Sequence, residues 1–201
     1  MKKFLLSALL AAMMLPASAE NPVDTNPVIE TIMARRSVRR YKEQPVEREK
    51  LDLVARCGVN APSAINKQPW AVRIVDDATF IDGVTREYAA KNPQQAADPA
   101  FKNMFRNAPA VIFIATPAGE GLVDAGLLGE NIILAAQSLG LGTCCLGAPT
   151  RFIKTDPAAA PYLSRLDIPE GYELQYAIAI GYPDEAPDAK PRDYSKIKFI
   201  D

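Results

Sequence analysis

Two short segments of this sequence carry residue types that could bind a phosphorylated cofactor. The first runs from Arg35 to Tyr41 and holds four arginines and one serine in seven residues. Guanidinium forks and a serine hydroxyl match the oxygens of a phosphate. The second runs from Ala61 to Trp70 and presents Ser, Asn and Gln side chains on a turn-forming backbone that contains two prolines. Such dipoles suit a polyol chain and the edge of a heteroaromatic ring. The two segments together therefore indicate a site for a cofactor that contains a phosphate, a polyol chain and a heteroaromatic ring.

The residues that the chain lacks narrow the chemistry further. There is no histidine, which excludes Ser-His-Asp and Cys-His catalysis, His-ligated metals and haem with a His axial ligand. The three cysteines, Cys57, Cys144 and Cys145, form no Cys-x-x-Cys pair, so no metal site is expected. Cys144 and Cys145 are expected to be two buried thiols, because a disulfide between sequence neighbours is strained. An organic redox cofactor needs none of these groups, since it carries the reactive atoms itself.

The N-terminal residues predict export. Two lysines precede the apolar run 4–15, which is too short for a stable membrane anchor, and the small-residue pattern Ala17-Ser18-Ala19 follows it. We therefore expect residues 1–19 to be a signal peptide and residues 20–201 to form the mature domain, in the periplasm or secreted. The start has no twin-arginine pair, so the chain would cross the membrane unfolded and take up its cofactor afterwards.

Composition and charge describe an ordinary globular domain. Hydrophobic residues make up 48% and charged residues 23% of the chain. Without residues 1–19, which carry two lysines and no acidic residue, the net charge falls from −1 to about −3. This balance gives no overall attraction to nucleic acid or to anionic lipid. The remaining length suits one domain.

Apolar periodicity predicts the elements that must position the two segments. Helices are expected from Pro27 up to the arginine cluster, over 47–59, over 80–88 and over 124–139. Strands are expected at 70–74, 110–115, 141–146 and 174–180, with an edge strand at 197–200. The stretch 92–107 is polar and irregular, which is typical of a long loop that covers a site. The helix over 124–139 is apolar on more than one side, so either a second subunit or a central position in a monomer must bury it.

The order of these segments resembles the FMN-dependent nitroreductase family. The motifs that carry the resemblance are Arg-x-Ser-x-Arg at 35–39, Pro-Ser-x-x-Asn-x-Gln-Pro-Trp at 62–70, Gly-Leu-Gly-Thr at 140–143, Ile-Pro-Glu-Gly-Tyr at 168–172 and Gly-Tyr-Pro at 181–183. The resemblance spans the chain from Pro27 to its end. It implies an α+β fold, a three-layer α/β/α sandwich around a mainly antiparallel sheet, in a homodimer with a domain-swapped tail and shared active sites.

The resemblance also implies which residues hold FMN. By position they are Arg35, Arg36, Ser37, Arg39, Pro62, Ser63, Ala64, Asn66, Gln68, Leu146, Gly147, Lys190 and Arg192. Arg35 and Ser37 would lie toward the phosphate, which a basic pair in the tail completes, and the 62–68 loop would reach the flavin of the partner subunit. Two positions are implied in catalysis. Arg39 would stabilise charge on the pyrimidine edge of the ring, and the backbone amide near Gly147 would face flavin N5.

The implied activity is a two-electron exchange. A reduced nicotinamide, NADH or NADPH, would pass two electrons through flavin N5 to a nitroaromatic, quinone or similar small acceptor. Two other interpretations stay open at this point, namely a flavin-binding protein for storage or sensing outside the cytoplasm, and a structural domain whose arginines and asparagines cap helices. No motif of the family aligns with residues 92–107, so the sequence does not identify the acceptor.

Overall fold

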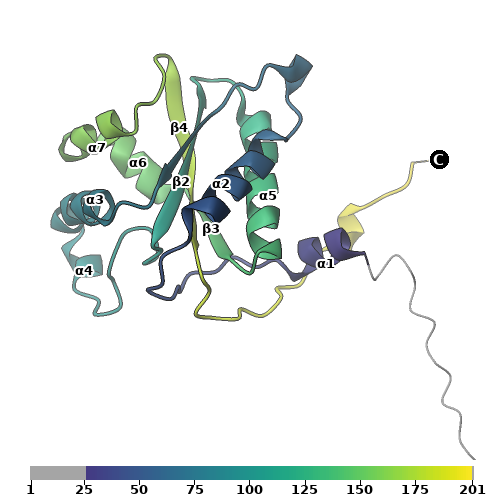
Figure 1. Cartoon of the computed structure of the whole chain (residues 1–201), viewed down its shortest axis with the longest axis horizontal. Coiled ribbons are helices and arrows are strands. Elements are labelled where there is room, and N and C mark those ends of the chain that lie inside the picture. Colours follow the sequence, from purple (N-terminus) through teal and green to yellow (C-terminus); the bar gives the residue numbers. More distant parts are fainter. Residues whose placement is uncertain (1–25, 201) are drawn as a thin grey trace, which may run out of the picture.

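A four-stranded sheet forms the centre of the computed structural model, which describes residues 26–200 (Figure 1). In spatial order the strands are β1 (Ala71–Val75), β2 (Ala110–Pro117), β4 (Tyr172–Gly181) and β3 (Gly142–Leu146). All three pairings are antiparallel, and Phe113 on β2 lies opposite Arg73 on β1 and Ala177 on β4. The expected antiparallel sheet is confirmed, with the continuously apolar strand at 110–115 in an inner position.

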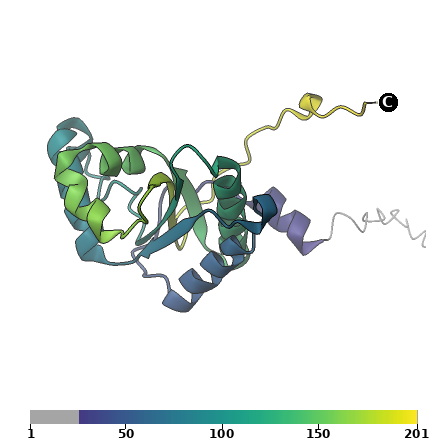
Figure 2. The same ribbon diagram turned by 90° about the horizontal axis from the view of Figure 1, so that it is seen from above.

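Helices cover both faces of the sheet, as Figures 1 and 2 show. One face carries α2 (Arg48–Val59) and α5 (Leu122–Ser138), with α1 (Pro27–Ala34) beside α5. The other face carries α3 (Ala78–Lys91), α4 (Pro93–Ala96), α6 (Ala148–Thr155) and α7 (Ala160–Arg165). Short 3₁₀ turns occur at η1 (Ala64–Asn66), η2 (Pro157–Ala159) and η3 (Tyr194–Lys196). The expected three-layer arrangement is therefore confirmed.

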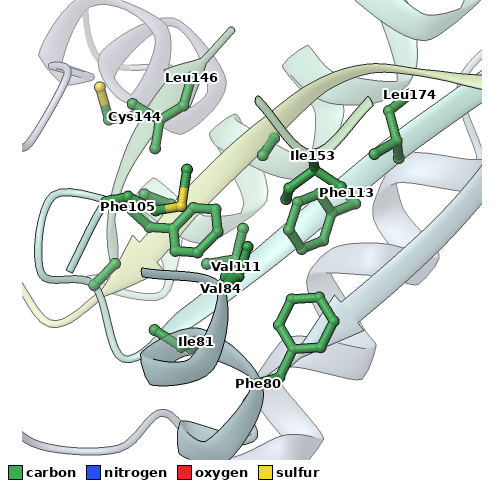
Figure 3. Packing of buried hydrophobic residues seen from close by; sticks show 14 of the residues in the cluster. Phe80, Ile81, Val84, Phe105, Val111, Phe113, Cys144, Leu146, Ile153 and Leu174 are labelled. Atoms are coloured by element: carbon green, nitrogen blue, oxygen red, sulfur yellow. The ribbon is translucent and has the colours of Figure 1, made fainter. Parts of the chain in front are cut away.

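The two cores of the sandwich share strand β2. Val111, Phe113 and Ala115 point into the cluster beneath α3, whereas Ala110, Ile112 and Ile114 point into the cluster beneath α2 and α5. Alternate strand residues face opposite sides of a sheet, so a strand covered on both sides must be apolar throughout. In the first cluster the ring of Phe113 makes edge contacts with Phe80 and Phe105, at centroid distances of 6.2 and 5.8 Å (Figure 3).

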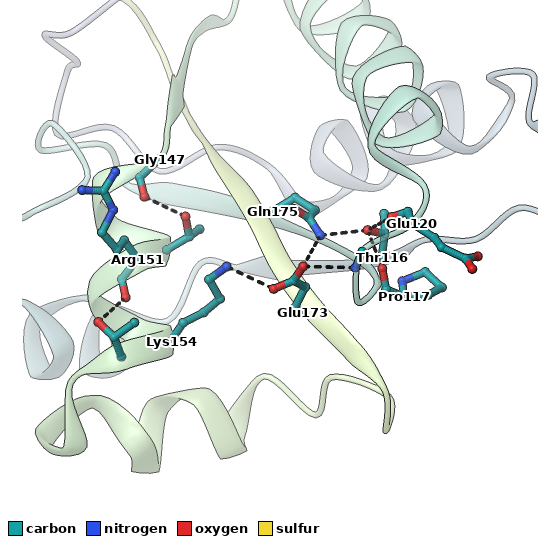
Figure 4. Close-up of polar contacts among 11 residues, drawn as sticks. Thr116, Pro117, Glu120, Gly147, Arg151, Lys154, Glu173 and Gln175 are labelled. Carbon is teal, nitrogen blue, oxygen red and sulfur yellow. Dashed lines mark hydrogen bonds and ion pairs between the residues drawn. The ribbon is translucent and has the colours of Figure 1, made fainter.

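The end of the molecule at the start of β4 is joined by polar contacts (Figure 4). Glu173 accepts hydrogen bonds from Gln175 Nε2 at 3.4 Å and from the Lys154 ammonium at 3.4 Å. The Gln175 amide, with the backbone N–H of Gly119, holds the pKa of Glu173 below its ordinary value. Gln175 Nε2 also donates to Thr116 Oγ1 at 2.9 Å, so β4, β2 and α6 are linked at this end.

Of the two ways to bury helix α5, the structure shows burial along one side within a single chain. Its inner side, including Leu128, Ile132 and Ile133, lies in the core of that chain. Ile133, at 6% exposure, therefore does not point toward a second subunit. The apolar residues that α5 exposes lie near its N-terminus, where Val123 is 76% exposed and Leu127 42% exposed. The sequence shows a helix that is apolar on more than one side, and only packing against the sheet shows which side is buried.

Two further expectations are wrong for the single chain. The residues 197–200 form no strand, and this part of the C-terminal tail is exposed and extends away from the body of the molecule (Figures 1 and 2). Cys144 is buried as expected, but Cys145 is exposed, because the two point to opposite sides of β3, which is an edge strand. Across residues 26–200, no helix combines the length and the apolar character that a membrane crossing requires.

Candidate functional site

A cavity of about 540 Å³ lies beside the end of strand β3. Three parts of the chain line it, namely Arg39 with Arg40, the residues 145–149 where β3 leads into α6, and residues between Tyr88 and Asn107. Its volume falls in the range of small-molecule sites. The polar stretch after α3 therefore does border a cavity, as its irregular sequence predicts.

The arginine segment is fixed along the free edge of β3. The backbone N–H of Val38 donates to the carbonyl of Thr143 at 2.9 Å, and the Tyr41 hydroxyl donates to the Val38 carbonyl at 2.6 Å. Val38 is buried against Gly142, where an added Cβ would lie only 2.8 Å from the Cβ of Val38. The close approach of these two residues places Arg39 at the cavity, because it follows directly on an anchored position.

Of the two arginines at this wall, one is paired with a carboxylate. Glu185 accepts from the backbone N–H of Arg39 at 2.5 Å and forms an ion pair with Arg40 Nε at 3.3 Å. The guanidinium of Arg39 donates only to the carbonyl of Ser37, at 3.2 Å, and forms no ion pair with a described residue. Glu185 thus holds the backbone of Arg39, while the positive charge of the Arg39 side chain remains available to a ligand.

The start of α6 adds a second positive feature to the cavity. The carbonyl of Gly147 accepts from Thr150 Oγ1 at 2.8 Å and from the Arg151 backbone N–H at 3.0 Å, so it is directed into the helix. The first N–H groups of a helix have no partner within the helix, and its dipole makes this end positive. The cavity thus meets a helix N-terminus at Gly147, where an added Cβ would find no atom within 4 Å.

Two titratable side chains lie behind this wall and stay protonated at neutral pH. Burial raises the pKa of the Cys144 thiol, against the opposing effect of the charges on Arg39 and Arg106. Burial likewise raises the pKa of the Tyr41 hydroxyl far above its ordinary value. Burial therefore disfavours both groups as general bases near pH 7.

The opposite wall of the cavity is a loop closed by two asparagines. Asn107 Oδ1 accepts from the backbone N–H groups of Lys102 and Asn103, at 2.8 and 2.9 Å, and its Nδ2 donates to the Ala100 carbonyl at 2.7 Å. Asn103 Oδ1 accepts from the N–H groups of Phe105 and Asn107, both at 2.9 Å. These bonds replace the regular backbone pairing that the loop lacks.

We expect Asn107→Ala to destabilise the protein by about 2 kcal/mol, because it removes three hydrogen bonds and places Ala at a φ of 63°. Urea unfolding followed by circular dichroism measures the change. Asn60→Ala is the matched control, because Asn60 makes a single side-chain bond, to the Arg56 carbonyl, and should lose less than about 1 kcal/mol. Equal losses in the two variants would contradict the structural role of Asn107.

The structure brings together some of the residues that the sequence proposes for the site. Arg39, Leu146 and Gly147 line the cavity, and Ser37 forms a bridge with Thr143 on the adjoining edge of β3. Arg35 is the C-cap of α1. Arg36 instead donates to the carbonyls of Met33 and Arg35 at 2.6 and 2.8 Å, so in this chain its guanidinium caps the helix α1.

Other proposed residues lie away from this cavity in a single chain. The 62–68 loop is bonded to the start of α5 through Asp124 Oδ1, which accepts from the Ala64 N–H at 3.2 Å. Within the loop, Ser63 Oγ accepts from the Gln68 N–H at 2.9 Å, and Asn66 has a φ of 57°. None of Pro62, Ser63, Ala64, Asn66 and Gln68 lines the cavity.

Lys190 and Arg192 lie in the exposed tail, where Arg192 donates to the Lys190 carbonyl at 3.1 Å. Their contribution to a site, like that of the 62–68 loop, would need a second copy of the chain. The roles of all thirteen proposed residues toward a cofactor stay predictions.

Sequence reasoning missed Arg106, Asn103 and Asn107, which form the opposite wall. Two asparagines four residues apart in a polar stretch were the only signal, and this spacing has no fixed structural meaning outside a helix.

Comparisons with known proteins agree with this architecture. A family model described as the nitroreductase family matches residues 32–182. An FMN reductase (NAD(P)H) of Bacillus subtilis is 28% identical over 187 residues, covering 83% of this chain and 70% of that one. The crystal structure of a nitroreductase with bound FMN from Desulfitobacterium hafniense has a TM-score of 0.78 at 26% identity, covering 88% of this chain and 99% of that one. An FMN-dependent nitroreductase from Clostridium difficile is 30% identical, with a TM-score of 0.65 over 86% of this chain and 99% of its own. The family model matches most of the length of this chain, and the fold is shared with solved nitroreductases. The chain therefore belongs to the nitroreductase family.

Proposed function

We propose that this chain is an FMN-dependent oxidoreductase of nitroreductase type. The observation that carries the proposal is the guanidinium of Arg39, which has no ion-pair partner among residues 26–200 and lines the same cavity as the positive end of α6 at Gly147. Membership of the family and its FMN-bound structural neighbours supports the choice of cofactor. The alternative interpretation, in which the arginines only cap helices, describes Arg36, which donates to a carbonyl at the end of α1. It does not describe Arg39, whose guanidinium donates to the Ser37 carbonyl outside the helix.

The residues present fit the proposed cofactor. The cavity has the volume of a ligand site, Arg39 supplies a cation for an anionic ring edge, and Gly147 leaves room for close approach to the backbone. Arg35, at the C-cap of α1, and Ser37, beside the edge of β3, would hold the phosphate. FMN supplies the reversible two-electron carrier, for which the side chains lining the cavity offer no substitute.

The chain's own residues would then bind and tune the cofactor. A cation at Arg39 would favour any state with added negative charge at the ring edge, and Glu185 holds the backbone from which this side chain extends. The overall reaction for a nitroaromatic acceptor uses one reduced nicotinamide and one proton. It yields the oxidised nicotinamide, a nitroso compound and water, with both electrons supplied by the nicotinamide. The proton would come from water, since burial raises the pKa of Cys144 and of Tyr41 and makes both weak acids.

We also propose that the enzyme works as a homodimer with shared sites, with NADH or NADPH as donor and a small aromatic or quinone-like acceptor. Its support in this chain is apolar side chains left exposed on two helices. On α1, Val28 and Met33 are 64% and 60% exposed, and at the N-terminal end of α5, Leu122 and Val123 are 63% and 76% exposed. Apolar side chains that a single chain leaves exposed are often covered by a second subunit.

Export to the periplasm or out of the cell is a further part of the proposal. It depends on the signal-peptide pattern of residues 1–19, which lie outside the described residues. FMN would then be taken up after export.

We expect the purified mature protein to be yellow and to contain stoichiometric FMN. The absorbance spectrum, recorded before and after NADH or NADPH is added without oxygen, tests both cofactor and donor. The oxidised flavin bands should disappear with at least one nicotinamide and return when a nitroaromatic or quinone is added. A preparation that stays colourless after incubation with excess FMN would contradict the assigned cofactor. Bands that bleach but never return with any acceptor would favour a flavin storage or sensing protein instead.

A further inference from the structure

We propose that Arg106 selects electron acceptors that carry a carboxylate or similar anionic group on an aromatic ring, an inference that rests on the function proposed above. Three features of the residues that line the cavity indicate this class of acceptor. They are an arginine without a carboxylate partner among residues 26–200, a loop that holds its backbone in place, and aromatic side chains that line the same cavity.

The charges around the cavity leave one guanidinium unassigned. Arg40 is paired with Glu185, and Arg39 is the residue proposed to serve the cofactor. Arg106 forms no ion pair with any residue in the described range 26–200. The acidic residue on the cavity wall, Asp98, accepts from the Ala100 N–H at 2.8 Å within its own turn. Three arginines and one aspartate thus line the cavity, which favours an anion bound there.

The backbone at Arg106 is held in an uncommon conformation. Its φ is 62° and that of Asn107 is 63°, a region that a residue with a long side chain seldom adopts. The four hydrogen bonds to the oxygens of Asn103 and Asn107 surround this position on both sides. The loop therefore fixes the point from which the Arg106 side chain extends, so ligand binding orders the side chain without also having to order the backbone.

Aromatic side chains that line the same cavity indicate the rest of the ligand. Tyr88 and Phe101 both line it, with ring centroids 6.4 Å apart and planes tilted by 30°. The Tyr88 hydroxyl donates to Gln95 Oε1 at 2.8 Å, which restrains its ring. A cavity lined by aromatic rings and by an arginine suits an aromatic ligand that carries an oxyanion.

A matched pair of acceptors tests the proposal with the FMN-loaded enzyme. The holoenzyme is reduced with dithionite without oxygen, and its reoxidation is followed by stopped-flow absorbance with 4-nitrobenzoate or with the neutral 4-nitrobenzamide. We expect Arg106→Gln to slow reoxidation by 4-nitrobenzoate about tenfold at low ionic strength, with less than a twofold change for 4-nitrobenzamide. Comparing each acceptor between the wild type and the variant cancels their difference in intrinsic reactivity.

Two variants serve as controls for charge and for position. Arg106→Lys keeps the cation and should restore most of the rate with 4-nitrobenzoate. Arg86→Gln removes a positive charge from an exposed site on α3 that does not line the cavity, and it should change neither rate. A second readout without turnover is the affinity for benzoate, measured by calorimetry, which should weaken about tenfold in Arg106→Gln alone.

The outcomes separate this inference from the proposed function. Equal effects on the charged and neutral acceptors would overturn the role of Arg106 while the enzyme still binds FMN and reduces 4-nitrobenzamide. The phosphates of a nicotinamide donor are another source of oxyanions, so a variant that changes only the reduction by NADH or NADPH also overturns it. Failure of the wild type to bind FMN overturns the proposed function, and this inference with it. If the wild type binds FMN but reduces neither nitro compound, unchanged benzoate affinity in Arg106→Gln overturns the inference and a selective loss supports it.

Discussion

Ile133→Asp is expected to prevent the chain from folding, with a loss of more than about 4 kcal/mol. Ile133 is 6% exposed and belongs to the core formed by α2, α5 and the sheet, so an aspartate there would be a buried charge without a partner. Most domains have a total stability of only about 5–15 kcal/mol. Circular dichroism and the yield of soluble protein measure the result. A variant that melts like the wild type would show that Ile133 is not part of this core.

Leu127→Asp is the matched substitution on the outer side of the same helix. Leu127 is 42% exposed, so the aspartate stays in water in a single chain and the fold should be kept. If the exposed surface of α1 and α5 forms the interface, this variant should fold, sediment as a monomer and lose FMN, because the proposed sites are shared. A folded monomer that still binds FMN tightly would contradict the shared site and leave the fold unaffected.

Arg39→Ala is expected to lower the rate of flavin reduction at saturating FMN by about 2 kcal/mol, or tens-fold. The side chain of Arg39 bonds only the Ser37 carbonyl, so its removal should leave the fold unchanged. Its charge helps most when the ring edge gains negative charge, which makes its loss a loss of rate more than of affinity. Stopped-flow reduction with NADH or NADPH measures the rate, and fluorescence titration measures the affinity for FMN.

Arg35→Ala is the comparison that separates catalysis from binding. A contact to the phosphate is the same before and after reduction, so we expect weaker FMN binding with a nearly normal rate once the site is saturated. If Arg39→Ala behaves in this same way, then Arg39 only anchors the cofactor and its proposed catalytic role is wrong.

Local sequence signals predicted most of the elements. Asn26 and Pro27 start α1, and the Asn26 side chain accepts from the Val28 N–H at 2.9 Å as an N-cap should. The unbroken apolar run at 110–115 forms the inner strand β2, because a strand that is covered on both faces must be apolar throughout. The order of the motifs is also enough to indicate the family, because many residue types must recur at fixed spacing.

The residue types and their order thus determined the fold class, the family and the role proposed for Arg39. Packing decided which side of α5 is buried, because a helix that is apolar on more than one side does not mark its inner face in the sequence. Only the contact with the sheet distinguishes Ile133 from Leu127. The exposure of Cys145 likewise depends on β3 being an edge strand, which pairing between distant segments determines. The place of Arg106 depends on hydrogen bonds in an irregular loop and on the cavity wall opposite it. Neither leaves a periodic pattern in the sequence, so only the tertiary structure shows that this arginine faces the site.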